Sequence, residues 1–382
     1  MKGICILKSK DIQFEIDSDI YSDCYVYEIP NNISQDKDYL DLIKTLLDIR
    51  KSDVSDILFV VNNDLYFNMA YIMKDVFTEK QAKMFIIPEY KITWLNKGYL
   101  IEDLYVEVDY HKPRLPQYQV HLTDVCNLNC KGCGHYCNLI DTPNFLDINK
   151  YKCDIEKIKE KFWGCRWIYL LGGEPLLHKE AYKFIDVTRA IFPDADIRFT
   201  TNGLLLPDMP DEFWQSVRKN HIHIEISQYR KTRENWKSIQ QAIIENDVQD
   251  STLVQTHKGQ FFKQRVLVPQ NDFALSYEKC ISQECHYLRD GKLYVCPSVA
   301  LNEFFYNYYG MEMPYESEGI DLYNTDLDGW ELLKELEQPN EACRYCTDKI
   351  EWFEWEVRSK QNVPMSDWIV EGEMHLCREK TI

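Results

Sequence analysis

Three cysteines on one short segment are the residues of this chain with the most specific chemistry. Cys126, Cys130 and Cys133 stand in VHLTDVCNLNCKGCGHYC with the spacing Cys-x3-Cys-x2-Cys, directly after an apolar, strand-like run. A four-iron, four-sulfur cluster takes four ligands, so three thiolates either use a distant fourth ligand or leave one iron open to a small molecule. The spacing therefore predicts an iron–sulfur centre whose open iron carries the chemistry.

A zinc site is the alternative for this segment, with Cys137 as the fourth ligand. Tetrahedral zinc sites usually pair two Cys-x2-Cys-like knuckles, and this run lacks the second one. The chain has 14 cysteines, and in a reducing compartment their clustering favours metal binding over disulfides. Nine of them fall in three groups, at 126–137, 280–296 and 343–346. We therefore predict that Cys137 is not required for the first centre.

A Gly-Gly-Glu-Pro turn follows the next predicted strand, about forty residues after the cysteines. Gly172 and Gly173 would let the backbone approach a ligand, and the Glu174 carboxylate or a carbonyl could accept hydrogen bonds from an ammonium group. With both motifs the chain resembles the radical S-adenosylmethionine (radical SAM) superfamily. The resemblance implies that the open iron binds the amino and carboxylate groups of SAM, and that Gly172, Gly173 and Glu174 help to bind this cofactor.

Two further strand ends match the superfamily more weakly. RFTTNGLLL, with Thr201 and Asn202, resembles its third-strand turn, and Ser227 resembles a polar position that contacts the cofactor after the fourth strand. Either could be an ordinary strand-end cap. The chain also departs from the pattern, because Gly132 stands before the third cysteine, where an aromatic residue often packs near the adenine. Tyr136 is our candidate for that packing.

The remaining cysteine groups resemble the SPASM or shortened twitch extension, a β-hairpin and helix that bind an auxiliary iron–sulfur cluster. Gly291 and Cys296 give Gly-x4-Cys, and Cys343 and Cys346 give Cys-x2-Cys. Only Cys377 follows this pair. A second auxiliary cluster would need more cysteines than this, so the sequence favours one auxiliary cluster.

The fourth auxiliary ligand has two candidates, Cys280 and Cys285. We favour Cys285 because it starts the hairpin strand, which gives the predicted metal ligands Cys285, Cys296, Cys343 and Cys346. The same four thiols could form a zinc knuckle instead.

The predicted elements place these motifs in an α/β protein. Short apolar runs alternate with helical patterns, which indicates a parallel sheet. The resemblance makes the central sheet a partial (β/α)6 barrel. We predict an N-terminal α/β module at 1–112 for substrate or partner recognition, the radical SAM partial barrel at 113–255, and a twitch-like auxiliary cluster domain at 256–382.

Charge and hydropathy restrict the partners. The net charge of -18 and the pI near 5.0 disfavour nucleic acid, whose binding depends on Lys and Arg. No window approaches the roughly 18 apolar residues of a membrane span, and the first residues lack the apolar core of a secretory signal. We expect a cytoplasmic protein that contacts no membrane.

The resemblance also implies a reaction. SAM would be cleaved reductively at the [4Fe-4S] cluster to a 5'-deoxyadenosyl radical, which abstracts hydrogen from the substrate. An electron donor such as flavodoxin or ferredoxin is implied. We predict a small-molecule substrate, a sugar or nucleotide-sugar; the alternatives are modification of a peptide and, more remotely, a non-catalytic iron–sulfur or zinc protein.

Overall fold

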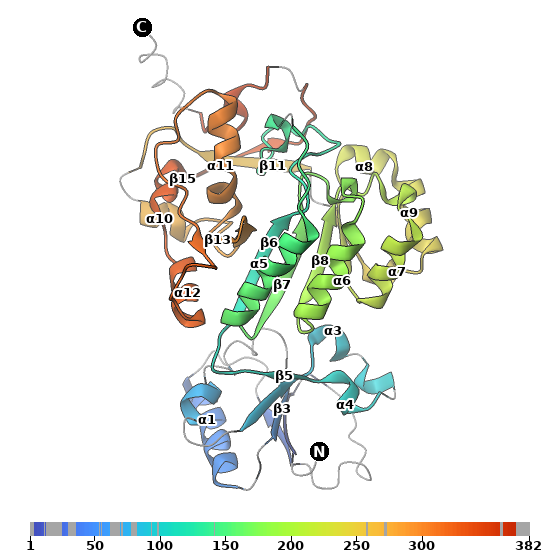
Figure 1. Cartoon of the computed structure of the whole chain (residues 1–382), viewed down its shortest axis with the longest axis vertical. Helices are drawn as coiled ribbons and strands as arrows, with labels where there is room; N and C mark the ends of the chain where they lie inside the picture. The colour runs from blue at the N-terminus through green and yellow to red at the C-terminus, as the bar shows by residue number, and fades with distance from the viewer. Residues whose placement is uncertain are drawn as a thin grey trace.

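The computed structural model describes most of the chain, and the gaps lie mainly near the two termini. The described residues are 4–10, 12, 25–29, 36–52, 54, 56–61, 69, 72–77, 82–92, 94–97, 99–140, 142–256, 259–270, 273–359 and 362–371. Cys377 lies outside them. Figure 1 shows a lower layer at the N-terminal end, a central sheet with helices beside it, and a C-terminal segment in orange and red next to that sheet.

The N-terminal residues form a separate sheet. Its elements are β1 (Ile4–Ser9), β2 (Tyr25–Ile29), α1 (Asp36–Lys51), β3 (Asp56–Val60), β4 (Lys83–Ile86), α3 (Glu89–Ile92), α4 (Ile101–Leu104) and β5 (Val106–Val108). The strand order is β2-β1-β3-β4-β5, parallel except for β5. The predicted strands in this region are confirmed, and α1 covers the predicted helix. Residues 72–76 are also helical.

The central sheet contains the predicted parallel strands in sequence order. Its elements are β6 (Arg114–His121), α5 (Ile148–Lys161), β7 (Gly164–Leu171), α6 (Ala181–Ile191), β8 (Asp196–Thr201), α7 (Asp211–Lys219), β9 (His223–Ser227), α8 (Arg230–Glu234), α9 (Trp236–Glu245) and β10 (Thr252–Gln255). Neighbouring strands from β6 to β10 are parallel. This arrangement confirms the predicted α/β class with a parallel sheet that resembles a partial barrel.

The helices of this sheet are held by side chains with helical spacing. Tyr151, Ile155 and Ile158 on α5 are fully buried against the strands, as are Phe184 and Ile185 on α6. Burying a large apolar side chain stabilises the fold by roughly 1.5 to 3 kcal/mol, so these faces fix the helices on the sheet. Helix α5 begins directly after Asp147, because the Asp147 side chain accepts hydrogen bonds from the backbone N–H groups of the first turn.

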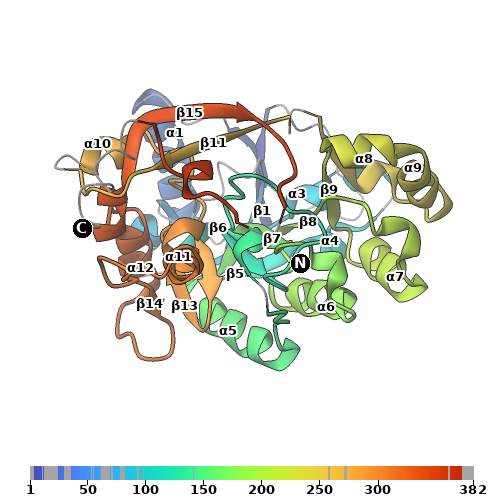
Figure 2. The same cartoon turned by 90° about the horizontal axis from the view of Figure 1, so that it is seen from above.

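The C-terminal segment extends the same sheet and adds a second layer. It consists of β11 (Gln260–Arg265), α10 (Phe273–Glu278), β12 (Tyr287–Arg289), β13 (Lys292–Tyr294), α11 (Pro297–Tyr308), β14 (Ile320–Asp321), α12 (Gly329–Leu336) and β15 (Cys346–Glu354). The hairpin β12–β13 joins the sheet beside β6. One detail differs from six consecutive barrel units: β11, the next strand after β10, pairs with β15 and not with the sheet. Figure 2 shows β11 and β15 on the side of the molecule opposite α5 and α6.

The N-terminal module packs against the ends of the barrel strands where those strands begin. The Tyr90 hydroxyl donates to the carbonyl of Pro193 at 2.9 Å, just before β8. Trp94 contacts His221, just before β9, with a ring separation of 4.5 Å. Trp163, just before β7, belongs to the buried core of the module. The module therefore lies at the end of the sheet away from the loops that carry the cysteines, as Figure 1 also shows.

None of the described helices is both long enough and apolar enough to cross a membrane.

Candidate active site

The Gly-Gly-Glu-Pro turn lies directly against the cysteine loop. The backbone N–H of Gly173 donates to the carbonyl of Thr123, and the N–H of Glu174 donates to the carbonyl of Val125, both at 2.9 Å. A Cβ atom on Gly172 would lie 2.4 Å from the Thr123 oxygen, and one on Gly173 would lie 2.1 Å from the Val125 oxygen. Glycine is therefore required at both positions because any side chain would push the turn away from the loop.

Glu174 holds two turns together. Its carboxylate is fully buried and accepts hydrogen bonds from the hydroxyl of Thr201 at 2.6 Å and from the backbone N–H groups of Asn202 and Leu176 at 2.9 and 3.1 Å. Burial raises the pKa of Glu174 to about 7, although these three hydrogen bonds oppose the shift. The carboxylate thus accepts from donors in its own turn and in the turn after β8, which leaves the backbone carbonyls of the turn as the other predicted acceptors.

Asn202 continues these contacts to the cysteine loop. Its side-chain amide donates to Oδ1 of Asn127 at 2.7 Å and lies 4.0 Å from the sulfur of Cys126. Its carbonyl accepts from the Thr232 hydroxyl, which also reaches the carbonyl of Ser227 at 3.4 Å. The ends of β6, β7, β8 and β9 are therefore joined by hydrogen bonds, as expected where the carboxyl ends of parallel strands meet.

The three thiols of the cysteine loop differ in their surroundings. Burial raises the pKa of Cys130 to about 12 and raises that of Cys126 still further. A hydrogen bond from Cys137 lowers the pKa of Cys133 to about 7. Cys137 itself is a buried thiol whose pKa is raised, first by this same hydrogen bond. The Cys137 thiol also donates to the carbonyl of His135 at 3.6 Å.

The C-terminal residues 353–359 and 362–368 cover this loop, and their role was not predicted. The indole N–H of Trp355 donates to the sulfur of Cys130 at 3.2 Å, and that of Trp368 donates to the carbonyl of Cys133 at 2.9 Å. Backbone contacts fix the segment, since the N–H of Lys131 donates to the carbonyl of Glu356 at 2.9 Å. The only sequence signal was the alternating aromatic pattern of EWFEWEV, which indicates a strand but not what it covers.

The same segment explains why a glycine stands before the third cysteine. Gly132 has a φ of +57°, and a Cβ atom there would lie 2.6 Å from the ring of Phe353. Phe353 on β15 therefore occupies the space beside the loop that a side chain at position 132 would need. Nearby, the ring of Tyr229 stacks on Trp355 with centroids 5.3 Å apart and planes 11° apart.

Tyr136, the residue expected to pack on the adenine, lies further toward the C-terminal cysteines. Its ring is buried, and its hydroxyl contacts Oδ1 of Asn302 and accepts from Arg265, each at 3.1 Å. Burial raises its pKa to about 12, and the thiols of Cys346 and Cys296 contribute to the shift. Tyr136 therefore lies between the two cysteine groups.

Both cysteine groups open into one cavity of about 910 Å³. Its lining contains Cys126, Cys130, Cys133, Gly172, Gly173, Thr201, Asn202, Ser227, Cys280, Cys285, Cys296, Cys343 and Cys346. Of the predicted site residues, Glu174 alone is missing from the described lining. The cavity therefore brings together cysteines that are up to 220 positions apart in sequence, from Cys126 to Cys346.

Cys280, which the sequence made the less favoured candidate for the fourth ligand, interacts with the other C-terminal thiols. The thiol of Cys280 contributes to the raised pKa values of Cys296, Cys343 and Cys346, after the larger effect of burial. The side-chain amide of Gln264 donates to Cys280 at 3.8 Å and also hydrogen-bonds Cys346.

Cys285 faces β6. Its pKa is raised by burial, and hydrogen bonds with the side chains of Gln117 and Gln119 oppose the shift. Across the described residues, no three His, Cys, Asp or Glu side chains are arranged as a ready-made metal site. The donor set nevertheless fits iron–sulfur clusters, because both groups consist of free thiols that face one cavity.

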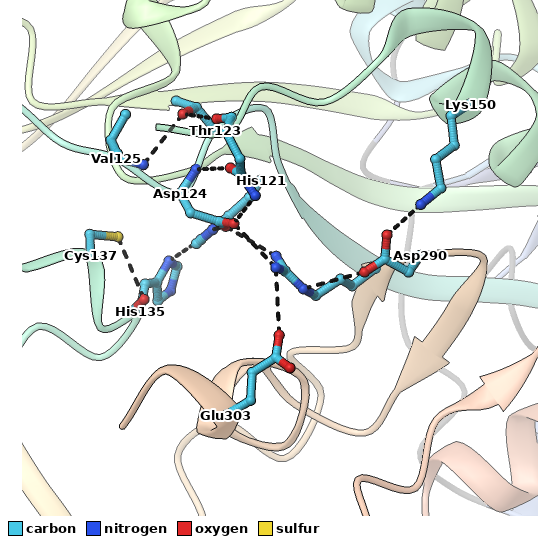
Figure 3. A network of polar contacts seen from close by, with 11 residues as sticks. His121, Thr123, Asp124, Val125, His135, Cys137, Lys150, Asp290 and Glu303 are labelled. Atoms are coloured by element: carbon cyan, nitrogen blue, oxygen red, sulfur yellow. Dashed lines mark hydrogen bonds and ion pairs between the residues drawn. The ribbon is translucent and has the colours of Figure 1, made fainter. Parts of the chain in front are cut away.

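A polar network links the cysteine loop to the C-terminal hairpin (Figure 3). Nδ1 of His121 lies 2.7 Å from Asp124, and its Nε2 lies 2.8 Å from Nδ1 of His135. Arg289 on β12 donates to both oxygens of Asp124, at 3.1 and 3.2 Å. Burial alone would raise the pKa of Asp124, but the contacts with His121 and Arg289 hold it well below its usual range.

Glu303 on α11 and Asp290 lie on the far side of Arg289, each 3.7 Å from it, and Lys150 on α5 pairs with Asp290. The network therefore fixes the hairpin against the barrel where the cysteine loop begins.

Comparison with known proteins shows what the barrel is similar to. Residues 120–245 match the model of the Radical SAM superfamily. GTP 3',8-cyclase of Clostridium acetobutylicum is 35% identical over 105 residues, which cover 27% of this chain and 32% of that protein. GTP 3',8-cyclase of Clostridium botulinum strain Hall is 31% identical over 133 residues, 35% of this chain and 40% of that protein. The chain thus spans 32% to 40% of the length of these curated relatives.

A solved structure of BtrN in complex with AdoMet and 2-DOIA matches 62% of this chain and 94% of its own, with 16% identity and a TM-score of 0.41. The family match supports the predicted radical SAM barrel over these residues. The matched residues 120–245 hold Cys126, Cys130 and Cys133 and are thus similar to the Radical SAM superfamily.

Proposed function

We propose that this chain binds a [4Fe-4S] cluster through Cys126, Cys130 and Cys133 and uses it to cleave SAM reductively. The observation that carries the proposal is the connection of these thiols to the turns after β7 and β8 around one cavity. When bound, the cluster and SAM supply a 5'-deoxyadenosyl radical that abstracts hydrogen from the substrate. The protein supplies position and a cavity that restricts water.

The surrounding residues have distinct proposed roles in binding SAM. Gly172 and Gly173 present backbone to the cavity, where carbonyl groups can accept from the ammonium of the cofactor. Asn202 and Ser227 line the same wall and can contact the cofactor with polar groups. Glu174 positions these turns, because its carboxylate is occupied by three donors of the protein.

An auxiliary [4Fe-4S] cluster is proposed at the C-terminal thiols. Cys296, Cys343 and Cys346 supply three ligands, and the contacts of Cys280 favour it over Cys285 as the fourth. A zinc knuckle of the same thiols is the alternative, and metal content separates the two.

The cavity favours a polar substrate rich in hydroxyl groups. Gln117, Gln119, Gln255 and Glu225 all line it, and Oε1 of Gln255 is buried without a hydrogen bond in the described structure. Amide and carboxylate oxygens suit sugar hydroxyls, which can both donate and accept. We therefore retain a sugar or nucleotide-sugar as the proposed substrate and a peptide as the alternative. The name of the curated relatives gives a nucleotide, GTP, as the compound that those proteins act on.

The N-terminal module is proposed to recognise a partner. Its position at the beginning of the barrel strands removes it from the described lining of the cavity. Substrate recognition by this module, the other part of the prediction, has less support from this placement. An electron donor such as flavodoxin or ferredoxin remains the expected source of electrons.

The proposed reaction is tested by anaerobic formation of 5'-deoxyadenosine from SAM with dithionite as reductant. The wild-type chain should form it, the triple variant Cys126→Ala, Cys130→Ala, Cys133→Ala should not, and Cys137→Ala should retain it. Persistent formation in the triple variant would refute the assignment of the cluster. Candidate nucleotide-sugars and peptides can then be compared by substrate-dependent acceleration of this reaction.

A further inference from the structure

Arg265 is a buried cation in the wall of the cavity. Only 7% of the surface of Arg265 is exposed. Its Nη1 donates to Oδ1 of Asn302 at 2.5 Å and to the Tyr136 hydroxyl at 3.1 Å. Nε is buried without a hydrogen bond in the described structure. The rings of Phe305 and Tyr306 lie 4.8 and 5.5 Å from the guanidinium carbon. Neutral oxygens and ring faces do not cancel a full positive charge, so an anion is needed nearby.

Two other buried or half-buried arginines of the chain are neutralised by a carboxylate. Arg114 is paired with the carboxylate of Asp194 at 3.1 Å, and Arg289 is paired with Asp124 at the same distance. For Arg265, the ion pairs found among the described residues include no carboxylate partner. The negative charge that balances Arg265 must therefore come from another kind of group.

The strand register places that group. Arg265 pairs with Cys346 in the antiparallel pair β11–β15, just after an irregularity in the register between Lys263 and Arg265, and the N–H of Val266 donates to the carbonyl of Tyr345 at 3.0 Å. Residues directly opposite each other in such a pair present their side chains on the same face, with Cβ atoms about 4.5 to 5.5 Å apart. Both Arg265 and Cys346 line the cavity, together with Cys296. The guanidinium therefore lies beside the thiols proposed to hold the auxiliary cluster.

We infer that Arg265 is the counter-cation of the auxiliary cluster and raises its reduction potential. This inference rests on the proposed auxiliary cluster. Four thiolates outweigh the positive charge of the cluster core, so the bound cluster is an anion, and reduction makes it more negative. A nearby cation stabilises the reduced form more than the oxidised form, because net charge and surrounding dipoles set the potential of such clusters. With Arg265 in place the cluster is easier to reduce.

The test is a redox titration of the auxiliary cluster by electron paramagnetic resonance. The full-length triple variant Cys126→Ala, Cys130→Ala, Cys133→Ala isolates this cluster after anaerobic reconstitution. Adding Arg265→Gln should shift the redox equilibrium toward the oxidised form by about tenfold, which is 59 mV for a one-electron couple. Arg265→Lys keeps the charge and should shift it less than about threefold.

Lys263→Gln is the matched control. It removes a positive charge from the same strand, but Lys263 is already paired with Glu351 at 3.0 Å. Lys263→Gln should also shift the redox equilibrium of the auxiliary cluster by less than about threefold, because the paired charge contributes little net field at the cluster.

The outcomes separate the two claims. An unchanged potential in Arg265→Gln, with iron content retained, would overturn the role of Arg265 alone. Zinc in place of iron in the triple variant would overturn the auxiliary cluster and the inference with it. If Arg265→Gln takes up no iron, restored uptake in Arg265→Lys supports the inference, and failure of that rescue contradicts it.

Discussion

Trp355 donates its indole N–H to the sulfur of Cys130 at 3.2 Å, across 225 positions of sequence. A hydrogen bond to a thiolate ligand stabilises the reduced cluster more than the oxidised one, because the reduced cluster carries more negative charge. Trp355→Phe should therefore lower the reduction potential of the cluster at Cys126, Cys130 and Cys133. A hydrogen bond to a charged group contributes about 1.5 to 3 kcal/mol, which sets an upper limit on the change.

Redox titration by electron paramagnetic resonance measures this effect. Trp352→Phe is the control, because Trp352 lies on β15 with 58% of its surface exposed. Equal potentials in the two variants would show that the contact with Cys130 has no influence on the cluster.

Removing Arg114 should destabilise the barrel strongly. Its guanidinium is buried and pairs with Asp194 at 3.1 Å, and that carboxylate also accepts from the backbone N–H of Cys165 at 3.1 Å. Arg114→Met leaves a buried carboxylate without its counter-charge, so the free energy of unfolding in urea should fall by about 3 to 5 kcal/mol. Arg230→Met removes an exposed partner of Glu234 and should change it by less than about 1 kcal/mol. Similar losses in both variants would contradict this account.

Glu174 should make stability depend on pH in an unusual direction. Burial raises its pKa from 4.5 to about 7, so the folded chain binds this proton more tightly than the unfolded chain. Its contribution to stability is therefore greatest below about pH 4.5 and is lost as the pH rises through 7. Relative to Glu174→Gln, which does not titrate, the wild type should lose on the order of 3 kcal/mol over this range. Urea unfolding at several pH values measures the difference, and a constant difference would exclude the shift.

Cys280 and Cys285 should differ in their effect on metal content. Gln264 contacts both Cys280 and Cys346, whereas Cys285 is hydrogen-bonded by side chains of β6. Cys280→Ala should lower iron by about four per chain after anaerobic reconstitution, and Cys285→Ala should leave it unchanged. The reverse result would restore Cys285, the ligand favoured by its position at the start of the hairpin.

The fold and the site could be predicted from the sequence where the spacing of nearby residues determines their geometry. Gly172 and Gly173 could be placed beside the cysteine loop because consecutive parallel strands end at the same edge of the sheet. The alternation of apolar runs and helical patterns also predicted the strands β6 to β9. These features depend on neighbours within one strand–helix unit.

Contacts between distant segments could not be predicted in this way. The Trp355 contact with Cys130 and the pairing of Arg265 with Cys346 both depend on how the C-terminal segment folds back over the barrel. The donors that occupy the Glu174 carboxylate come in part from the turn after β8, which is distant in sequence. Gly132 departed from the family pattern for a reason that lies on β15, at Phe353.

The most direct test of two iron–sulfur sites in one cavity is the iron, sulfide and zinc content of the anaerobically reconstituted chain. The wild type should contain about eight iron and eight sulfide per chain, and the Cys126, Cys130, Cys133 triple alanine variant about four of each. Four iron with one zinc in the wild type, or full iron content in the triple variant, would contradict the account.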